Sequence, residues 1–259
     1  DKELTEYARS IGFESVNFDL VYGLPMQTPQ TAERMAELTL QLRPDRIALY
    51  SFALVPWVKK AHNLFAEENL PTGAEKRKLY EICRNAFLEN GYIEIGMDHF
   101  ALPTDALSIA EKNKTLHRNF MGYTEHRTDV LLGLGVSSIS DASTCFHQNE
   151  KQFPVYERRV LNGEIPTMRG HLLTTEDRKR REQILTLMTT WETELDNEAH
   201  AEDVTNYLAP LIEDKLCQIH GDKIVVPPAG KPFLRNICMS LDARLRRSAP
   251  NKKVFSQSV

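Results

Sequence analysis

The first hundred residues alternate strand-like and helix-like segments, and this alternation limits the possible folds more than any other feature of the sequence. Residues 15–24 form an apolar run that ends in Gly-Leu-Pro, which predicts a strand buried on both faces. Thr28 and Pro29 suit the N-cap and the first position of the helix that follows. Two further strands are expected at residues 46–53 and 92–97.

The helix between those two strands begins with a capping box, in which the Thr72 and Glu75 side chains each bond to the other residue's backbone amide. Strands that alternate with helices imply right-handed parallel crossovers. The first part of the chain is therefore expected to be an α/β sheet, either doubly wound or rolled toward a barrel. In both architectures, ligands bind beyond the carboxyl ends of the strands.

Polar residues fall near these strand ends. Asp19 lies in an otherwise apolar strand, and Asp98 and His99 directly follow the third strand. These residues can also have structural roles. Asp19 can brace the next turn, and a lone histidine is more often structural than catalytic. Residues 116–124, which mix polar and aromatic side chains, are expected to form a surface or site loop. Two glycines in 131–140 predict a short strand that another backbone or molecule approaches closely.

From about residue 174 the composition changes, and a helical module with a hairpin is expected. Thr174 and Asp177 open a long helix, and a second helix follows it. Two short apolar runs meet at Gly221-Asp222, a pair that favours a hairpin turn, and a last helix ends in a basic tail. This order resembles a winged-helix module. Because its second helix is acidic, a scaffold or lid role is favoured over DNA binding.

Charge and cysteine usage exclude several classes of protein. With 32 Lys and Arg against 36 Asp and Glu, the net charge is −4, so no nucleic-acid partner is expected. No apolar run reaches the roughly 20 residues that cross a bilayer, so a cytoplasmic protein without a membrane partner is expected. The four cysteines include no C-x-x-C pair, which suits a reducing compartment. Fingerprints of nucleotide-binding proteins, serine hydrolases and zinc peptidases are also missing from the sequence.

Five local strings resemble a single protein family. They are NFDLVYGLP (17–25), GMDHFA (96–101), HRNF with GYT (117–124), GLGVSSIS (133–140) and RNICMSLD (235–242). Together they are similar to the oxygen-independent coproporphyrinogen III oxidases, also called coproporphyrinogen dehydrogenases, of the radical S-adenosylmethionine (SAM) superfamily. The resemblance covers essentially the whole chain.

This resemblance implies a fold and an activity. Residues 1–170 would be the C-terminal part of a radical SAM (β/α) barrel with substrate-site loops, and 171–259 a mainly α, winged-helix-like domain with a small β-hairpin. The intact oxidoreductase would hold a 4Fe-4S cluster and two SAM molecules. A 5′-deoxyadenosyl radical would start the oxidative decarboxylation of two propionates of coproporphyrinogen III to vinyl groups, giving protoporphyrinogen IX in haem biosynthesis. A flavodoxin or ferredoxin is the implied electron donor, and a monomer is expected.

The resemblance also implies roles for individual residues. Contacts to SAM are expected from Asp19, Ala53 and Ile139. Residues expected near the substrate are Asp98, His99, Arg118 and Asn119. Among these, Arg118 is the expected partner of a substrate propionate, because its guanidinium matches a carboxylate at two points.

Two departures from the family pattern bear on activity. Met121 stands where the family commonly has Gln between HRNF and GYT. The cluster-binding C-x-x-x-C-x-x-C motif is missing from these 259 residues. The chain is therefore expected to supply no metal ligand, and the cysteines of the motif are expected upstream. The opening helix, at residues 4–11 and closed by Gly12, agrees with an omitted upstream part. The chain alone is therefore expected to be inactive.

Three alternatives to the oxidase function are a related haem-binding chaperone, a DNA-binding regulator and a nonfunctional remnant.

Overall fold

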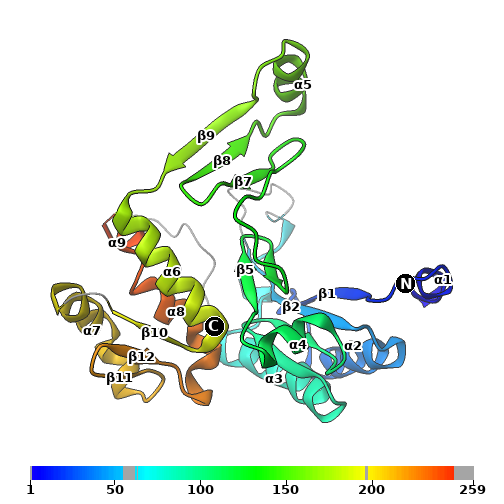
Figure 1. Cartoon of the computed structure of the whole chain (residues 1–259). Helices are drawn as coiled ribbons and strands as arrows, with labels where there is room; N and C mark the ends of the chain where they lie inside the picture. The colour runs from blue at the N-terminus through cyan, green and yellow to red at the C-terminus, as the bar shows by residue number, and fades with distance from the viewer. Residues whose placement is uncertain (1, 55–61, 63, 196–197, 248–259) are drawn as a thin grey trace.

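The computed structural model describes residues 2–54, 62, 64–195 and 198–247. Its N-terminal part is an α/β unit with these elements: α1 (Lys2–Ser10), β1 (Asn17–Tyr22), α2 (Pro29–Leu42), β2 (Arg46–Ser51), η2 (Glu67–Asn69), α3 (Gly73–Glu89), β3 (Ile93–Gly96), β4 (His99–Ala101) and α4 (Ala106–Lys112). The four strands form one mixed sheet in the order β1-β2-β4-β3 (Figure 1). β1 and β2 are parallel and joined through α2, whereas β4 is antiparallel to both of its neighbours.

Local sequence signals set the starts of α2 and α3. The predicted N-cap at Thr28 and the predicted capping box of Thr72 and Glu75 both form. α2 ends at Arg43, which adopts a left-handed φ of 46°. The predicted third strand forms as β3 and runs in the same direction as β2, but β4 lies between them. Prediction of the alternating α/β unit is thus confirmed, with one extra antiparallel strand.

Helices α2 and α3 cover one face of this sheet. Leu20, Ile47 and Phe100 point from that face into a core shared with the two helices. The prediction that the first strand is buried on both faces is wrong, because Asn17 and Asp19 on its other face are exposed. β1 is the last strand of the sheet, so among the described residues it has a strand neighbour on one side only.

The opposite face of the sheet is partly covered by α4 and by a hairpin of β5 (His117–Asn119) and β6 (Gly122–Thr124). Ile95, Ala101 and Tyr123 belong to a second buried cluster on this side. The expectation of a loop at 116–124 is therefore corrected, since this stretch contains two paired strands. Each strand has only three residues, too few for a recognisable alternation of polar and apolar side chains.

A second antiparallel sheet extends away from the α/β unit. It consists of β7 (Ile139–Asp141), β8 (Cys145–Asn149) and β9 (Thr167–Leu172), with α5 (Phe153–Leu161) at its far end (Figure 1). The strand predicted within 131–140 is limited to the start of β7. A Cβ atom on Gly133 would lie 2.6 Å from the Ile139 carbonyl oxygen, so the predicted close approach of another backbone is confirmed.

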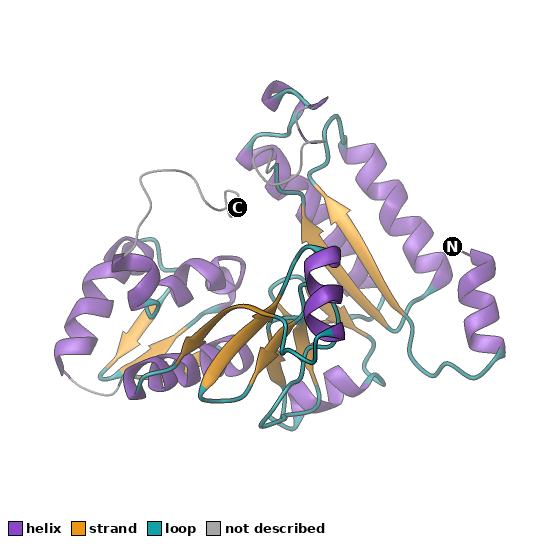
Figure 2. Cartoon of the chain, turned by 90° about the horizontal axis from the view of Figure 1, so that it is seen from above, coloured by secondary structure: helices purple, strands orange, loops and turns teal. Residues whose placement is uncertain are grey.

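The C-terminal module follows β9. Its elements are α6 (Thr175–Thr190), β10 (Glu192–Glu194), α7 (Glu198–Glu213), β11 (Gln218–His220), β12 (Lys223–Val225), η3 (Pro228–Phe233), α8 (Leu234–Met239) and α9 (Ala243–Arg247). The predicted hairpin forms between β11 and β12, and β10 adds a third strand. Figure 2 shows the helices of this module gathered around its small sheet. The predicted last helix is divided, because Ser240 to Asp242 separate α8 from α9.

Two expectations concern the chain as a whole. The domain boundary expected at residue 170 falls inside β9, which continues to Leu172, and the division into domains stays a prediction. Within the part of the chain that the structure describes, no helix has the length and apolar character needed to cross a membrane.

Candidate functional site

The sheet face opposite α2 and α3 carries the polar residues predicted from the sequence. Asp19 on β1 pairs with Ala48 on β2, which in turn pairs with His99 on β4. Directly paired residues point to the same face, so these side chains form one row across three strands. Tyr50 lies further along the same face of β2, and its ring meets the His99 ring edge-to-face at 6.1 Å.

Tyr50 shows that charged groups surround this row. Burial raises the pKa of the Tyr50 phenol, the negative charges of Asp19 and Asp98 raise it further, and Arg118 opposes the shift. All three charges therefore lie close enough to act on one hydroxyl. The structure thus brings Asp19, Asp98, His99 and Arg118 together around a tyrosine that sequence reasoning missed.

Asp98 and His99 form a pair at the turn between β3 and β4. Asp98 Oδ1 lies 2.8 Å from His99 Nδ1, and the two side chains are 19% and 12% exposed. The Leu49 amide donates to the Asp98 carbonyl oxygen at 2.7 Å, which ties this turn to β2. A carboxylate at Nδ1 orients the imidazole and leaves Nε2 available to hold or move a proton.

The β5–β6 hairpin places Arg118 in the same cluster. Its guanidinium lies over the Tyr123 ring at 4.5 Å from the ring centroid, and the His99 ring meets Tyr123 at 5.4 Å. The Arg118 Nη1 atom is buried, and no residue that the structure describes accepts a hydrogen bond from it. A buried donor without an acceptor is costly unless a ligand supplies one. A guanidinium in this position is suited to a carboxylate ligand.

Asn119 has a local structural contact. Its Oδ1 atom accepts hydrogen bonds from the backbone amides of Met121 at 2.9 Å and Gly122 at 3.3 Å. These bonds close the turn between β5 and β6. Met121 lies at that turn and is 65% exposed. A role of Asn119 near the substrate stays a prediction.

The residues expected to contact SAM lie on three separate elements. Asp19 is exposed on β1, and its Oδ1 accepts a 2.8 Å hydrogen bond from the Asn17 side chain. Ala53 is half-buried shortly after β2, and Ile139 is half-buried on β7. The expectation of a carboxylate within a fully buried strand is wrong for Asp19, because its side chain is exposed on the face of the sheet opposite α2 and α3. Its exposed oxygens can accept hydrogen bonds from ligand hydroxyl or ammonium groups.

The described residues do not fit an iron–sulfur cluster. Among them, no three His, Cys, Asp or Glu residues are grouped so that they could hold a metal ion. Burial raises the pKa of the Cys83 and Cys217 thiols to about 11 and that of Cys238 to about 12. Burial thus disfavours the thiolate form of these cysteines, which is the form that binds iron.

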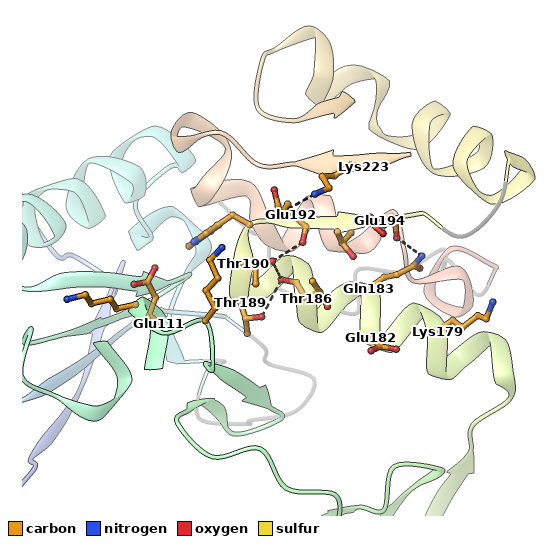
Figure 3. Close-up of a pocket in the computed structure, with 14 residues that line it drawn as sticks. Glu111, Lys179, Glu182, Gln183, Thr186, Thr189, Thr190, Glu192, Glu194 and Lys223 are labelled. Atoms are coloured by element: carbon orange, nitrogen blue, oxygen red, sulfur yellow. Dashed lines mark hydrogen bonds and ion pairs between the residues drawn. The ribbon is translucent and has the colours of Figure 1, made fainter. Parts of the chain in front are cut away.

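Two large cavities lie beside α6, away from this cluster. One, of about 960 Å³, opens between α4 and the C-terminal module, with Glu111 on one side and Thr186 on the other (Figure 3). The second, of about 560 Å³, is lined by His117 and several charged residues. Because neighbouring strand residues alternate between faces, His117 points away from the Arg118 side of the hairpin. No residue predicted to form a site lines either cavity, and no local motif marks them, since their walls come from separate elements.

Comparison with known proteins places the chain in a family. No family model matches it. It is 37% identical over 256 residues to the oxygen-independent coproporphyrinogen III oxidase of Escherichia coli, covering 95% of this chain and 56% of that protein. It is 37% identical over 248 residues to the same enzyme of Paracoccus denitrificans, covering 93% and 55% of the two chains. For the Thermostichus vulcanus enzyme, the identity is 36% over 267 residues, with 99% of this chain and 82% of that protein covered.

The fold gives the same result. The solved structure of coproporphyrinogen III oxidase (HemN) from Escherichia coli, described as a radical SAM enzyme, matches with a TM-score of 0.88 at 35% sequence identity. The match covers 95% of this chain and 59% of that chain. The chain spans about half the length of the Escherichia coli and Paracoccus relatives. The family resemblance inferred from the sequence motifs is confirmed, and this chain belongs to the oxygen-independent coproporphyrinogen III oxidases.

Proposed function

We propose that this chain forms the substrate-binding part of an enzyme that, when complete, converts coproporphyrinogen III to protoporphyrinogen IX in haem biosynthesis. Membership of the oxidase family supports the reaction class. The observation that carries the assignment of this surface is the Arg118 guanidinium, whose buried Nη1 atom has no acceptor among the described residues. A propionate of the substrate would supply that acceptor.

The mixed sheet would be part of a radical SAM barrel. α2 and α3 cover one of its faces while polar residues gather on the other, as expected where strands surround a ligand site. Asp19, Ala53 and Ile139 would hold SAM, with Asp19 accepting hydrogen bonds from its hydroxyl or ammonium groups. When bound, SAM supplies the radical that removes a hydrogen atom from a propionate.

The chain's own side chains bind and orient the substrate in this proposal. Each reacting propionate loses one hydrogen atom, one electron and CO2, and becomes a vinyl group. Arg118 is assigned to a propionate that is retained, because stabilising a carboxylate that must leave as CO2 would oppose the reaction. Asp98, paired with Nδ1, would orient the His99 ring so that its Nε2 atom can form a hydrogen bond with a polar group of the substrate.

Electron supply and assembly belong to the complete protein. The described residues hold no ligand set for the 4Fe-4S cluster, so the cluster would be bound by another part of the complete protein. The proposal includes two SAM molecules per protein, a flavodoxin or ferredoxin as electron donor, and a monomeric enzyme.

An anaerobic assay of the complete gene product with coproporphyrinogen III, SAM and a reductant tests the proposal. The wild-type protein is expected to form vinyl product, detected by mass spectrometry. Arg118→Gln is expected to raise KM about tenfold, because a charge-assisted hydrogen bond is lost, with a smaller change in kcat. Haem transfer without vinyl product would select the chaperone alternative instead.

Arg246→Gln is a matched control for this experiment. The Arg246 guanidinium also lies over a tyrosine ring, at 5.6 Å from the Tyr207 centroid, and it pairs with Asp203. It belongs to the C-terminal module, away from the cluster around Tyr50. If the Arg118 and Arg246 variants have the same KM as the wild type, the assignment of Arg118 is wrong.

A further inference from the structure

Tyr123 contacts three groups from separate parts of the chain. Its ring meets the His99 imidazole edge-on at 5.4 Å and lies beneath the Arg118 guanidinium at 4.5 Å. Its hydroxyl donates a 2.9 Å hydrogen bond to the carbonyl oxygen of Met188 in α6. Tyr123 is only 7% exposed, so these contacts are made in the interior. One side chain therefore joins two candidate substrate-binding residues to the C-terminal module.

Two glycines provide the space for this arrangement. A Cβ atom at Gly96 would lie 2.4 Å from the Tyr123 hydroxyl oxygen and 2.6 Å from Cζ, closer than real Cβ atoms come to other atoms. A Cβ atom at Gly122 would lie 3.2 Å from His99 Nε2, and Gly122 has a φ of 146°. Any larger residue at position 96 would thus displace the phenol.

The electrostatics keep the Tyr123 hydroxyl in its donor form. Burial raises the pKa of the phenol, Arg118 partly opposes the shift, and Asp98 and Cys238 add to it. The phenol therefore stays protonated and retains its hydrogen bond to α6. Cys238 belongs to α8, so two helices of the C-terminal module contribute to the surroundings of this one hydroxyl.

We propose that Tyr123 is a positioning residue for carboxylate recognition, which orients Arg118 and His99 and ties both to α6. Stacking on a ring fixes the plane of a guanidinium, so that its N–H groups can meet a carboxylate edge-on. The bond to Met188 fixes the ring in turn. The C-terminal module thereby helps to set the affinity for a propionate-bearing ligand. This inference rests on the proposed function.

The test compares two tyrosines with the same chemistry in different places. Tyr92 is 3% exposed, and its hydroxyl donates a 2.6 Å hydrogen bond to the Pro44 carbonyl oxygen within the α/β core. Tyr123→Phe and Tyr92→Phe each remove one buried phenol–carbonyl bond and keep the ring. The probe is coproporphyrin III, whose fluorescence reports its binding to the purified chain. NMR signals of the His99 ring report its position independently of any ligand.

Tyr123→Phe is expected to weaken coproporphyrin III binding about fivefold, as the loss of one hydrogen bond allows, and to shift the His99 ring signals. Tyr92→Phe is expected to change neither. If both variants only lose stability, with affinity and His99 signals unchanged, Tyr123 is structural and the inference is wrong. If the wild-type chain does not bind coproporphyrin III, the proposed function fails for this chain, and the His99 signals alone decide on Tyr123.

Gly96→Ala displaces the same ring without altering Tyr123. It is expected to weaken binding and shift the His99 signals at least as strongly as Tyr123→Phe. Gly73→Ala is its control, because a Cβ atom at Gly73 would meet nothing within 4 Å. Wild-type affinity and wild-type His99 signals in a folded Gly96→Ala protein would also overturn the inference.

Discussion

Asp105 is a buried carboxylate whose hydrogen bonds hold several segments together. Its side chain is 2% exposed, and Arg46 Nε donates to both oxygens, at 2.8 and 2.9 Å. The Ser15 hydroxyl donates at 3.0 Å, and the Leu107 amide donates at 2.8 Å as the N-cap bond of α4. The Arg46 side chain is itself only 23% exposed. Loss of the carboxylate would therefore leave a partly buried cation without this partner.

We expect Asp105→Ala to lower the free energy of unfolding by about 3 kcal/mol, because it breaks a largely buried ion pair and leaves Arg46 with the longer, 3.6 Å contact to Glu125. Loss of the N-cap of α4 adds to this effect. Ser15→Ala removes only the neutral hydrogen bond to Asp105 and should cost about 1 kcal/mol. Urea unfolding followed by circular dichroism measures both values. Equal losses for the two variants would contradict the importance of the Arg46–Asp105 pair.

At the scale of elements, the start of α6 is fixed to α9 through Asp177. Its Oδ2 atom accepts hydrogen bonds from the Thr174 amide at 2.9 Å and the Thr174 hydroxyl at 2.8 Å. Arg244 of α9 donates to both carboxylate oxygens at 2.7 Å. Arg244, more than Thr174, holds the pKa of Asp177 well below its usual range. The helix cap and the contact between the two helices thus depend on one ionised carboxylate.

This lowered pKa predicts a pH dependence of stability. A carboxyl group with a lowered folded-state pKa stabilises fully above its unfolded-state pKa, which is about 4, and this stability is lost as the pH falls toward the folded-state pKa. Asp177→Asn should therefore be less stable than the wild type at pH 7, and the difference should shrink below about pH 4. Urea unfolding across this range measures the difference, and a constant difference would contradict the prediction.

Glu75→Gln is the control for that measurement. Glu75 occupies the same position in the capping box of α3, but its carboxylate bonds only to Thr72 among the hydrogen bonds of the described residues. Thr72 lowers the pKa of Glu75, without the arginine that acts on Asp177. A smaller pH dependence is therefore expected for the Glu75 variant.

Elements set by neighbouring residues were predictable from the sequence, and those set by distant partners were not. The caps at Thr28, Thr72 and Thr174 each use a residue three positions away. By contrast, β4, β5 and β6 have three residues each and are defined by pairing with other strands. α5 has no side-chain N-cap bond and no buried residue, so Pro154 in its first turn was a weak signal by itself.

The candidate site shows the same division. Asp98 and His99 were predicted because they follow a strand, and Arg118 because it lies in a family motif. Tyr50 was missed because a tyrosine in an apolar segment has the pattern of a core residue. Tyr123 was missed because its segment was expected to form a loop and not a strand that packs against the sheet. Only the folded chain brings charged groups next to their hydroxyls.

At the scale of the whole molecule, the α/β unit and the C-terminal module have separate cores. One core includes Phe87 and Phe100, and another includes Leu187 and Ile237. Met97, at the turn that precedes β4, packs against the second core. The packing of Met97 and the hydrogen bond from Tyr123 to α6 connect the α/β unit to the C-terminal module. The modules can therefore differ in stability while remaining joined.

Leu187→Ala should test this separation. Leu187 is fully buried, so its truncation is expected to cost about 2–5 kcal/mol. Hydrogen exchange should become faster in α6, α7 and α8, while the amides of β2 and α3 keep their protection. Phe87→Ala should give the opposite pattern. Equal acceleration throughout the chain would show that the two cores unfold as one unit.

The position of β1 at the end of the sheet has a consequence for solubility. In the part of the chain that the structure describes, the outer edge of β1 has no strand partner. Such an edge invites pairing with the edge of another molecule, and a charged side chain on the strand opposes this aggregation. Asp19 places an exposed carboxylate on β1. In this 259-residue chain, the residue proposed to bind a ligand is therefore also expected to oppose edge-to-edge pairing of β1. Asp19→Ala should make this chain aggregate more readily than the wild type, which light scattering measures.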